Sequence, residues 1–408
     1  MEFLRIEQLQ IIILAGAIIA LIARRLKIPY TVGLVTAGLL VSFLSLPLDV
    51  NFSKDLLFKV LLPPLIFEAA LYIKWSELRR DISLIIVYAT VGVVLSAGVT
   101  AGFMRYAAGW SWQAAILFGV LIAATDPVSV IATFKEAKVE GRLRLLVEAE
   151  SLFNDSTAAV AFAVALAFAA GETLTFGSSL WLMFVSVTGG IVSGLLVGGL
   201  ALLVIGRTKD HLVELSMTTV AAFGSFWLAE HFQLSGILAA TTAGLLVGNL
   251  TKFGSFTEKG EESIGHFWDF AAFVVNSVIF IILGVNLAYQ DFAAAFIPII
   301  IAIAAVVVGR AIAVYPCSAL FGWTRLSVDT KHQHIMFWGG LRGALALALA
   351  LGIPESFTYR QEILTVTFGV VAFSVFVQGL TIPMLLRRLG QVPNSPKTVN
   401  KDIGVAEN

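Results

Sequence analysis

Glu148-Ala149-Glu150-Ser151-Leu152-Phe153-Asn154-Asp155 places acids and an amide inside a hydrophobic run that extends from Val147 to Ala170. About 20 apolar residues are enough for a helix to cross a bilayer, so this run predicts a membrane span. A carboxylate at mid-membrane costs about 2.5–3.5 kcal/mol on insertion scales, and such groups usually serve ion pathways or proton relays. The stretch therefore predicts a membrane protein that handles ions.

The composition of the whole chain agrees with this interpretation. Its 408 residues are 58% hydrophobic and only 13% charged, with a mean hydropathy of +0.90, whereas soluble domains average about 25% charged residues. The 27 basic and 27 acidic residues cancel, which argues against a nucleic-acid partner. A single cysteine, Cys317, excludes an intrachain disulfide and disfavours a cysteine metal site.

Hydrophobic runs predict an all-α polytopic membrane protein with about thirteen spans. We place them near residues 8–23, 29–47, 56–73, 82–104, 112–134, 146–170, 179–206, 212–229, 234–250, 263–287, 292–315, 332–352 and 362–386. Most of the 27 basic residues fall in the odd-numbered loops and after the last span. The positive-inside rule then puts the N-terminus outside and the C-terminus in the cytoplasm.

The spans also divide into two blocks of six, before and after the seventh. An odd span between them forces opposite orientations, the arrangement of an inverted repeat. We therefore expect a first six-helix repeat with its linker helix over 1–206, an inverted second repeat over 207–388, and a short cytoplasmic tail over 389–408. Matching spans, the fifth and the twelfth, are interrupted by Thr125-Asp126-Pro127 and by Gly339-Gly340-Leu341-Arg342-Gly343. Interrupted spans in matching positions indicate a transport site.

The residues around Pro127 predict a helix that unwinds inside the membrane. Asp126 precedes a proline and so resists the helical conformation, while Pro127 lacks a backbone donor and frees carbonyls near Ala123 for a cation. A kinked helix in which Asp126 caps the downstream half is the alternative, and it is compatible with ion binding.

On the sixth span, Ser151 and Asp155 lie four residues apart on one helix face, and Glu150 and Asn154 share the neighbouring face. A hydroxyl and a carboxylate are oxygen ligands for a small monovalent cation, so Ser151 and Asp155 are candidate ligands. Asn154 is a candidate bridge to the broken fifth span.

Three more charged residues lie inside predicted spans. Glu68 follows Pro63-Pro64 and is a further candidate for the ion site, with snorkelling or pairing elsewhere as the alternative. Arg310 and Arg342 cannot lose their protons and need partners, for which Glu150 and Asp126 are candidates. We expect both arginines to organise the helices.

These residues resemble the sodium/proton exchangers of the cation:proton antiporter superfamily, in the branch of NhaP-type antiporters and animal sodium/hydrogen exchangers. The matching stretches are Leu61-Leu62-Pro63-Pro64 through Glu68, Ala124-Thr125-Asp126-Pro127, Glu150 to Asp155, Gly309-Arg310, and Gly339 to Ala344. They span nearly the whole chain in the family's order.

The resemblance implies thirteen helices, a dimerisation domain, and a six-helix core in which two broken helices cross. Asp155 would be the essential carboxylate, joined in binding Na⁺ by Ser151, the main-chain carbonyl of Thr125, and Glu68. The resemblance also implies supporting roles: Asn154 and Asp126 would tie the sixth helix to the crossing, Glu150 would pair with Arg310, and Arg342 would support the second broken helix. The order Asn154-Asp155 resembles the electroneutral branch, and the short tail resembles prokaryotic members.

We expect the protein to exchange Na⁺ or Li⁺ for H⁺, with the cation and the proton competing for Asp155. Because burial disfavours the ionised form of a carboxylate, we expect Asp155 to hold either a proton or a cation. We expect no enzymatic activity, no cofactor beyond the transported ions, a location in a prokaryotic plasma membrane, and a homodimer. Potassium/proton antiport by the same mechanism is the nearest alternative. An intramembrane aspartyl protease using Asp126 and Asp155, or a cation channel, is a more distant one.

Overall fold

The computed structural model describes residues 6–26, 28–44, 54–137, 139–172, 175–250 and 256–391. These residues form helices and the loops between them, and contain no strand. Seven helical stretches in the described part of the chain are long and apolar enough to cross a membrane. They are Trp75–Tyr106, Arg142–Ala169, Gly177–Ile205, His211–His231, Glu258–Leu287, Phe296–Leu320 and Arg360–Arg388. The all-α membrane fold is confirmed.

The other predicted spans correspond to shorter helices. Helices α1 (Ile6–Leu26), α2 (Tyr30–Phe43) and α12 (Gly236–Leu250) are apolar, and the third predicted span comprises α3 (Lys54–Leu56), η1 (Leu57–Leu61) and α4 (Leu62–Leu71). Two predicted spans are broken into α7 (Trp112–Leu121) with α8 (Val128–Ala137), and α15 (Thr330–Trp338) with α16 (Ala344–Leu351). The total of thirteen spans and the inverted repeat remain predictions.

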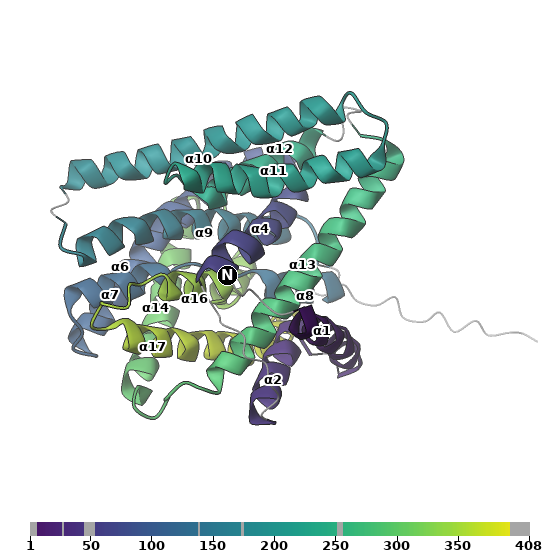
Figure 1. Cartoon of the computed structure of the whole chain (residues 1–408). Coiled ribbons are helices and arrows are strands. Elements are labelled where there is room, and N and C mark those ends of the chain that lie inside the picture. The colour runs from purple at the N-terminus through teal and green to yellow at the C-terminus, as the bar shows by residue number, and fades with distance from the viewer. Residues whose placement is uncertain are drawn as a thin grey trace, which may run out of the picture.

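The helices pack into two groups that each draw on both halves of the chain (Figure 1). In the outer bundle (residues 6–71 and 176–287), α13 (Glu258–Leu287) packs along α2, while α10 (Phe176–Ile205) packs against α11 (His211–His231) and α12. Helix α12 also packs on α4. Helices α2 and α13 approach closely at Gly38 and Gly284, where a Cβ on either would lie 2.9 Å from the Cα of the other.

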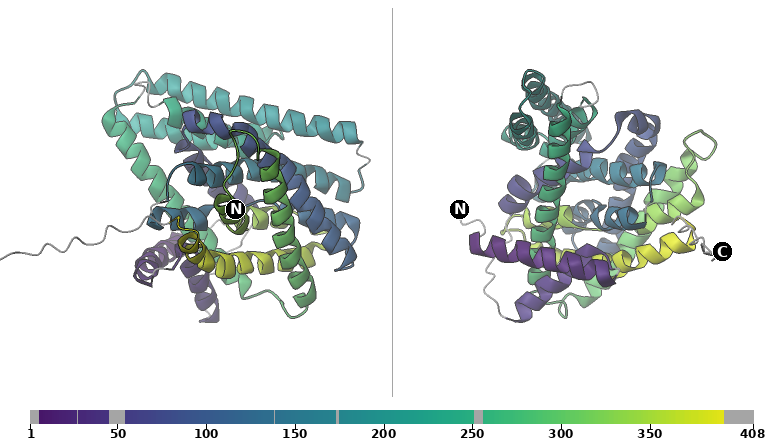
Figure 2. Two further views of the ribbon diagram at one scale, coloured as in Figure 1. Left: turned by 180° about the vertical axis from the view of Figure 1, so that it is seen from behind. Right: turned by 90° about the vertical axis from the view of Figure 1, so that its right-hand side faces the viewer.

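The crossing bundle (residues 75–169 and 296–388) contains both broken helices. Helix α14 (Phe296–Leu320) packs on α6 (Val93–Tyr106), α6 packs on α7, and α7 packs on α9 (Arg142–Ala169). Its remaining helices are α5 (Trp75–Val87) with the π-helical segment η2 (Tyr88–Gly92), and α17 (Arg360–Phe373) continuing through η4 (Ser374–Gly379) into α18 (Leu380–Arg388). Figure 2 shows the outer bundle, with α10 and α11 at its edge, beside the crossing bundle.

Polar interactions, most of them partly buried, hold the two ends of the crossing bundle. At one end, Arg142 donates hydrogen bonds to Asp81 Oδ1 at 2.7 and 3.0 Å and to the carbonyls of Leu326 and Ser327. At the other end, the Trp110 indole donates to Glu362 Oε1 at 2.8 Å. The bonds from Arg142 to Leu326 and Ser327, and the bond from Trp110 to Glu362, each join the first predicted repeat to the second, so the bundle is cross-linked at both ends.

Candidate functional site

The two helix breaks lie against each other. The backbone N–H of Asp126 donates to the carbonyl of Leu341 at 2.8 Å, which joins the first break to the second. Gly343 is required at this contact, because a Cβ built on it would lie 1.9 Å from Asp126 Oδ2. The predicted crossing of the broken fifth and twelfth spans thus has a direct hydrogen bond at its centre.

Asp126 serves the N-terminal ends of both downstream half-helices. Its Oδ1 accepts a hydrogen bond from the backbone N–H of Val128 at 2.9 Å, where α8 begins. It also interacts with the backbone N–H of Ala344, the first residue of α16. Helix N-termini carry a partial positive charge and free N–H groups, so one carboxylate compensates two half-helices. The capping alternative for Asp126 is therefore observed.

The C-terminal ends of the upstream half-helices each face an arginine. Arg342, only 1% exposed, donates through Nη1 to the carbonyls of Ala123 and Ala124, just beyond the end of α7. Arg310 donates to the carbonyl of Met336 in the last turn of α15. Positive side chains are favourable beside the partial negative charge of a helix C-terminus.

These contacts change two sequence-based expectations. The carbonyls near Ala123 that Pro127 was expected to free for a cation are bound by Arg342. Arg342 itself comes from the second broken span, yet its hydrogen bonds support the first. The sequence placed Arg342 correctly at a helix break but could not show which break its guanidinium would reach.

Glu150 pairs with Arg310, as the family resemblance implied. Arg310 Nη1 and Nη2 lie 2.7 and 2.9 Å from the two carboxylate oxygens, and the Glu150 side chain is 2% exposed. Asn154 donates to Glu150 Oε1 at 3.2 Å and to Thr125 Oγ1 at 3.4 Å. Asn154 thus connects the ion pair on α9 to the first helix break, which is the bridge expected of it.

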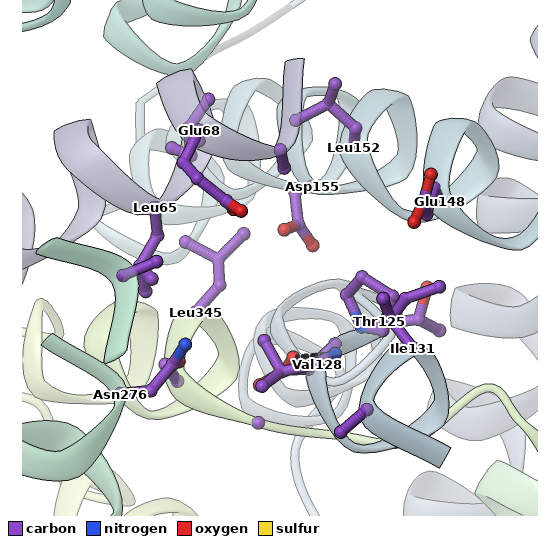
Figure 3. A pocket seen from close by; sticks show the side chains of 18 of the residues that line it. Leu65, Glu68, Thr125, Val128, Ile131, Glu148, Leu152, Asp155, Asn276 and Leu345 are labelled. Carbon is purple, nitrogen blue, oxygen red and sulfur yellow. Dashed lines mark hydrogen bonds between the residues drawn. The ribbon is translucent and has the colours of Figure 1, made fainter. Parts of the chain in front are cut away.

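A cavity of about 300 Å³ reaches the crossing from one side of the protein. Four of the predicted site residues line it: Glu68, Thr125, Asp126 and Asp155. Figure 3 shows the carboxyl groups of Glu68 and Asp155 turned toward the same space from α4 and α9. The cavity therefore lies between the outer bundle and the crossing bundle, with Glu68 on one wall and Asp155 on the other.

Asp155 differs from the other acids at the crossing. Its Oδ1 is buried and has no hydrogen-bond partner among the residues that the structure describes. Ser151 does not line the cavity; its hydroxyl lies 3.1 Å from Thr125 Oγ1, behind the wall. Asn154, Glu150, Arg310 and Arg342 likewise do not line the cavity. Asn154 Oδ1 is also buried without a partner among the described residues, but Asp155 lines the cavity and Asn154 does not.

The same architecture occurs in the sodium proton antiporter MjNhaP1 from Methanocaldococcus jannaschii, with a TM-score of 0.74, 22% identity, and coverage of 94% of this chain and 98% of that one. A family model described as "Sodium/hydrogen exchanger, transmembrane" matches residues 11–388. This chain belongs to the sodium/hydrogen exchanger family.

Relatives of this exchanger include the Na(+)/H(+) antiporter ApNhaP of Aphanothece halophytica, 38% identical over 90% of this chain and 70% of that protein. The low-affinity Na(+)/H(+) antiporter NhaS1 of Synechocystis is 36% identical over 96% of this chain and 76% of that protein. The resemblance inferred from the sequence motifs is confirmed.

The mouth of the exchanger's cavity is lined by charged residues that the sequence analysis left outside the site. Lys135 and Arg144 come from α8 and α9, Glu148 from α9, and Asp269 from α13. Arg144 Nε lies 2.8 Å from Glu148 Oε1. Tyr72, at the end of α4, donates to the carbonyl of Gly265 and lines the same mouth.

Asn276 is a cavity residue that the sequence analysis missed. It lines the cavity from α13, and its Oδ1 is buried without a partner among the described residues. The sequence offers little reason to select it, because Asn276 is a single amide in the apolar half of a span and has no proline, glycine or charged residue beside it.

Proposed function

We propose that this exchanger carries Na⁺ across the membrane in exchange for H⁺, and that both ions use Asp155. The observation that supports this most directly is the buried, unpartnered Oδ1 of Asp155 at the inner end of the cavity. A buried carboxylate oxygen without a donor is costly, and either a proton or a bound cation removes that cost.

The charges around the crossing single out Asp155. Asp126 faces two helix N-termini, and Glu150 forms a bidentate ion pair with Arg310. Arg342 neutralises the C-terminal end of α7. Asp126 and Glu150 hold fixed partners within the protein, so they are poor acceptors for a transported cation, whereas Asp155 Oδ1 has no hydrogen-bond partner among the described residues.

Glu68 and Thr125 supply further ligands on the cavity wall, and Ser151 completes the proposed Na⁺ site. Glu68 faces Asp155 from the outer bundle (Figure 3). Ser151 lies in hydrogen-bond contact with the Thr125 side chain, so it either orients Thr125 or turns its hydroxyl to the ion. Hard oxygen ligands of this type suit a small monovalent cation.

Antiport follows from competition for a single carboxylate. An empty, ionised Asp155 would have to cross the apolar barrier as an uncompensated charge, so only the protonated or cation-loaded site moves. Access alternates when the crossing bundle moves against the outer bundle, which changes the side on which the cavity opens. Because one Na⁺ replaces one H⁺ at one carboxylate, exchange is electroneutral.

The cavity opens toward the cytoplasm in this proposal. Its mouth lies near the ends of α4, α8, α9 and α13, next to loops that the positive-inside rule assigns to the cytoplasm. The same rule puts the N-terminus outside and the C-terminus inside. Thirteen spans in two inverted repeats, a homodimer, and a bacterial plasma membrane complete the proposed organisation.

The protease alternative requires two carboxylates that share a water molecule. Asp126 is instead engaged by backbone N–H groups at Val128 and Ala344, and the relatives are antiporters. Transport through Asp155 accounts for the site better.

Reconstitution in liposomes tests the proposed function. The protein is placed in vesicles that hold a pH-sensitive dye, and a pH gradient is imposed. Na⁺, Li⁺ or K⁺ is then added in turn, once with the membrane potential clamped and once without the clamp. We expect Na⁺ and Li⁺ to dissipate the gradient regardless of the clamp. A response to K⁺ alone would reassign the cation, and the absence of any cation-dependent change in internal pH would refute exchange.

A further inference from the structure

Asn276 lies in the apolar half of α13, where a polar side chain needs a reason to be present. Polar groups within membrane spans are expensive and usually functional. Two neighbouring polar residues of this helix are accounted for: Ser277 bonds to the Phe273 carbonyl and to Tyr30, and the Asn286 amide donates to the Ile282 carbonyl at 2.9 Å. Asn276 has no comparable explanation, because its buried Oδ1 lacks a partner among the described residues.

The position of Asn276 relates it to the transport site. It lines the cavity from the outer bundle, whereas Asp155 lines it from the crossing bundle. Figure 3 shows the carboxamide pointing into the cavity beside Leu345, on the side opposite Asp155. Glu68 stands on the same outer-bundle wall. The outer bundle therefore presents a carboxylate and a carboxamide to an ion that approaches Asp155.

We propose that Asn276 is a cation ligand on the entry path, which receives Na⁺ from the cavity and passes it to Asp155. An amide oxygen is a hard, neutral ligand of the kind that alkali and alkaline-earth cations use in proteins. The terminal torsion of asparagine is soft and roughly two-fold. A half-turn about it moves Oδ1 from its unpaired position into the cavity, where water or a cation satisfies it.

Because its side chain is neutral, Asn276 can bind a cation without competing for protons, which the carboxylates cannot do. An amide oxygen binds a cation but takes up no proton in the working pH range. Loss of this ligand should weaken the apparent affinity for Na⁺ and leave the proton reaction unchanged. Loss of Asp155 would alter both. This inference rests on the proposed site, and it names one more residue within it.

The test compares two asparagines of one helix. Asn276→Ala and the control Asn286→Ala are reconstituted with the wild-type protein, and the initial rate of Na⁺-driven proton flux is measured against Na⁺ concentration at several pH values. We expect Asn276→Ala to raise the KM for Na⁺ about fivefold to tenfold, the scale of one lost polar contact. The maximal rate and the pH dependence at saturating Na⁺ should stay unchanged, and Asn286→Ala should resemble the wild type.

A further variant separates ligand loss from misfolding. Asn276→Asp keeps the size and an oxygen ligand, so it should retain a low KM for Na⁺ while adding a new proton-dependent component. An unchanged KM in Asn276→Ala would overturn the inference, as would an equal rise in Asn286→Ala. The proposed function is judged separately by wild-type exchange and by its loss in Asp155→Asn.

Discussion

Glu150 and Asp155 lie five residues apart on α9, and among the described residues Glu150 has an ion-pair partner while Asp155 Oδ1 has no hydrogen-bond partner. Arg310 holds both oxygens of Glu150 at 2.7 and 2.9 Å, whereas Asp155 Oδ1 is buried and unpaired. In the proposed mechanism, the same helix thus carries a carboxylate whose charge is fixed by an ion pair and a carboxylate whose charge depends on a transported ion.

The Glu150–Arg310 pair predicts an asymmetry between single and double variants. Glu150→Gln or Arg310→Gln leaves one buried charge without its partner, which costs about 3–5 kcal/mol. The double variant removes both charges and should be clearly more stable than either single variant. Thermal unfolding of the purified proteins in detergent measures this. A double variant as unstable as the sum of the singles would show that the pair is not coupled.

A side chain at position 343 should create a steric clash at the crossing. Gly343→Ala places a Cβ 1.9 Å from Asp126 Oδ2, so the two breaks must move apart. We expect at least a tenfold loss of exchange together with a lowered melting temperature. Gly199→Ala is the control, because nothing lies within 4 Å of a Cβ at that position of α10. Normal exchange in Gly343→Ala would mean that the close contact at Gly343 is not needed for transport.

Ser151 predicts a graded effect. Ser151→Ala removes the hydroxyl that contacts Thr125, and should raise the KM for Na⁺ severalfold without abolishing transport. Ser156→Ala is a matched control on the same helix, since the Ser156 hydroxyl bonds only to the Leu152 carbonyl. Measurement of flux against Na⁺ concentration distinguishes them. Equal KM values for the two variants would remove Ser151 from the site.

Arg142 predicts a loss of stability that leaves cation binding intact. Arg142→Ala deletes the contacts to Asp81 and to the carbonyls of Leu326 and Ser327 at one end of the crossing bundle. We expect a loss of about 2–4 kcal/mol, consistent with several charge-assisted hydrogen bonds, and an unchanged KM for Na⁺ in the protein that remains folded. A large rise in KM would instead connect this end of the bundle to the ion site.

Sequence patterns predicted those parts of the site that depend on residues close together in the chain. Asp126-Pro127 indicated a helix break, and the four-residue spacings on α9 indicated which side chains share a face. The partnership of Glu150 with Arg310 came from the family resemblance and is observed.

Contacts between segments that are far apart in the chain could not be predicted from the sequence. Arg342 donates to the carbonyls of Ala123 and Ala124, and the Asp126 N–H donates to the Leu341 carbonyl. Both contacts depend on how the two helix breaks lie against each other. Ser151 shared the right helix face with Asp155 but lies behind the cavity wall, because Thr125 stands in front of it. Asn276 was missed because its significance comes from the cavity and not from its neighbours in sequence.

Proton release on cation binding tests the central claim most directly. Purified wild-type protein and Asp155→Asn are placed in weakly buffered detergent solution with a pH indicator, and Na⁺ is added, with choline as the ionic-strength control. Competition at Asp155 predicts release of up to about one proton per wild-type protomer on saturation with Na⁺, and none from Asp155→Asn. Equal Na⁺-dependent proton release from the two proteins would contradict the account, because the exchanged proton would then reside elsewhere.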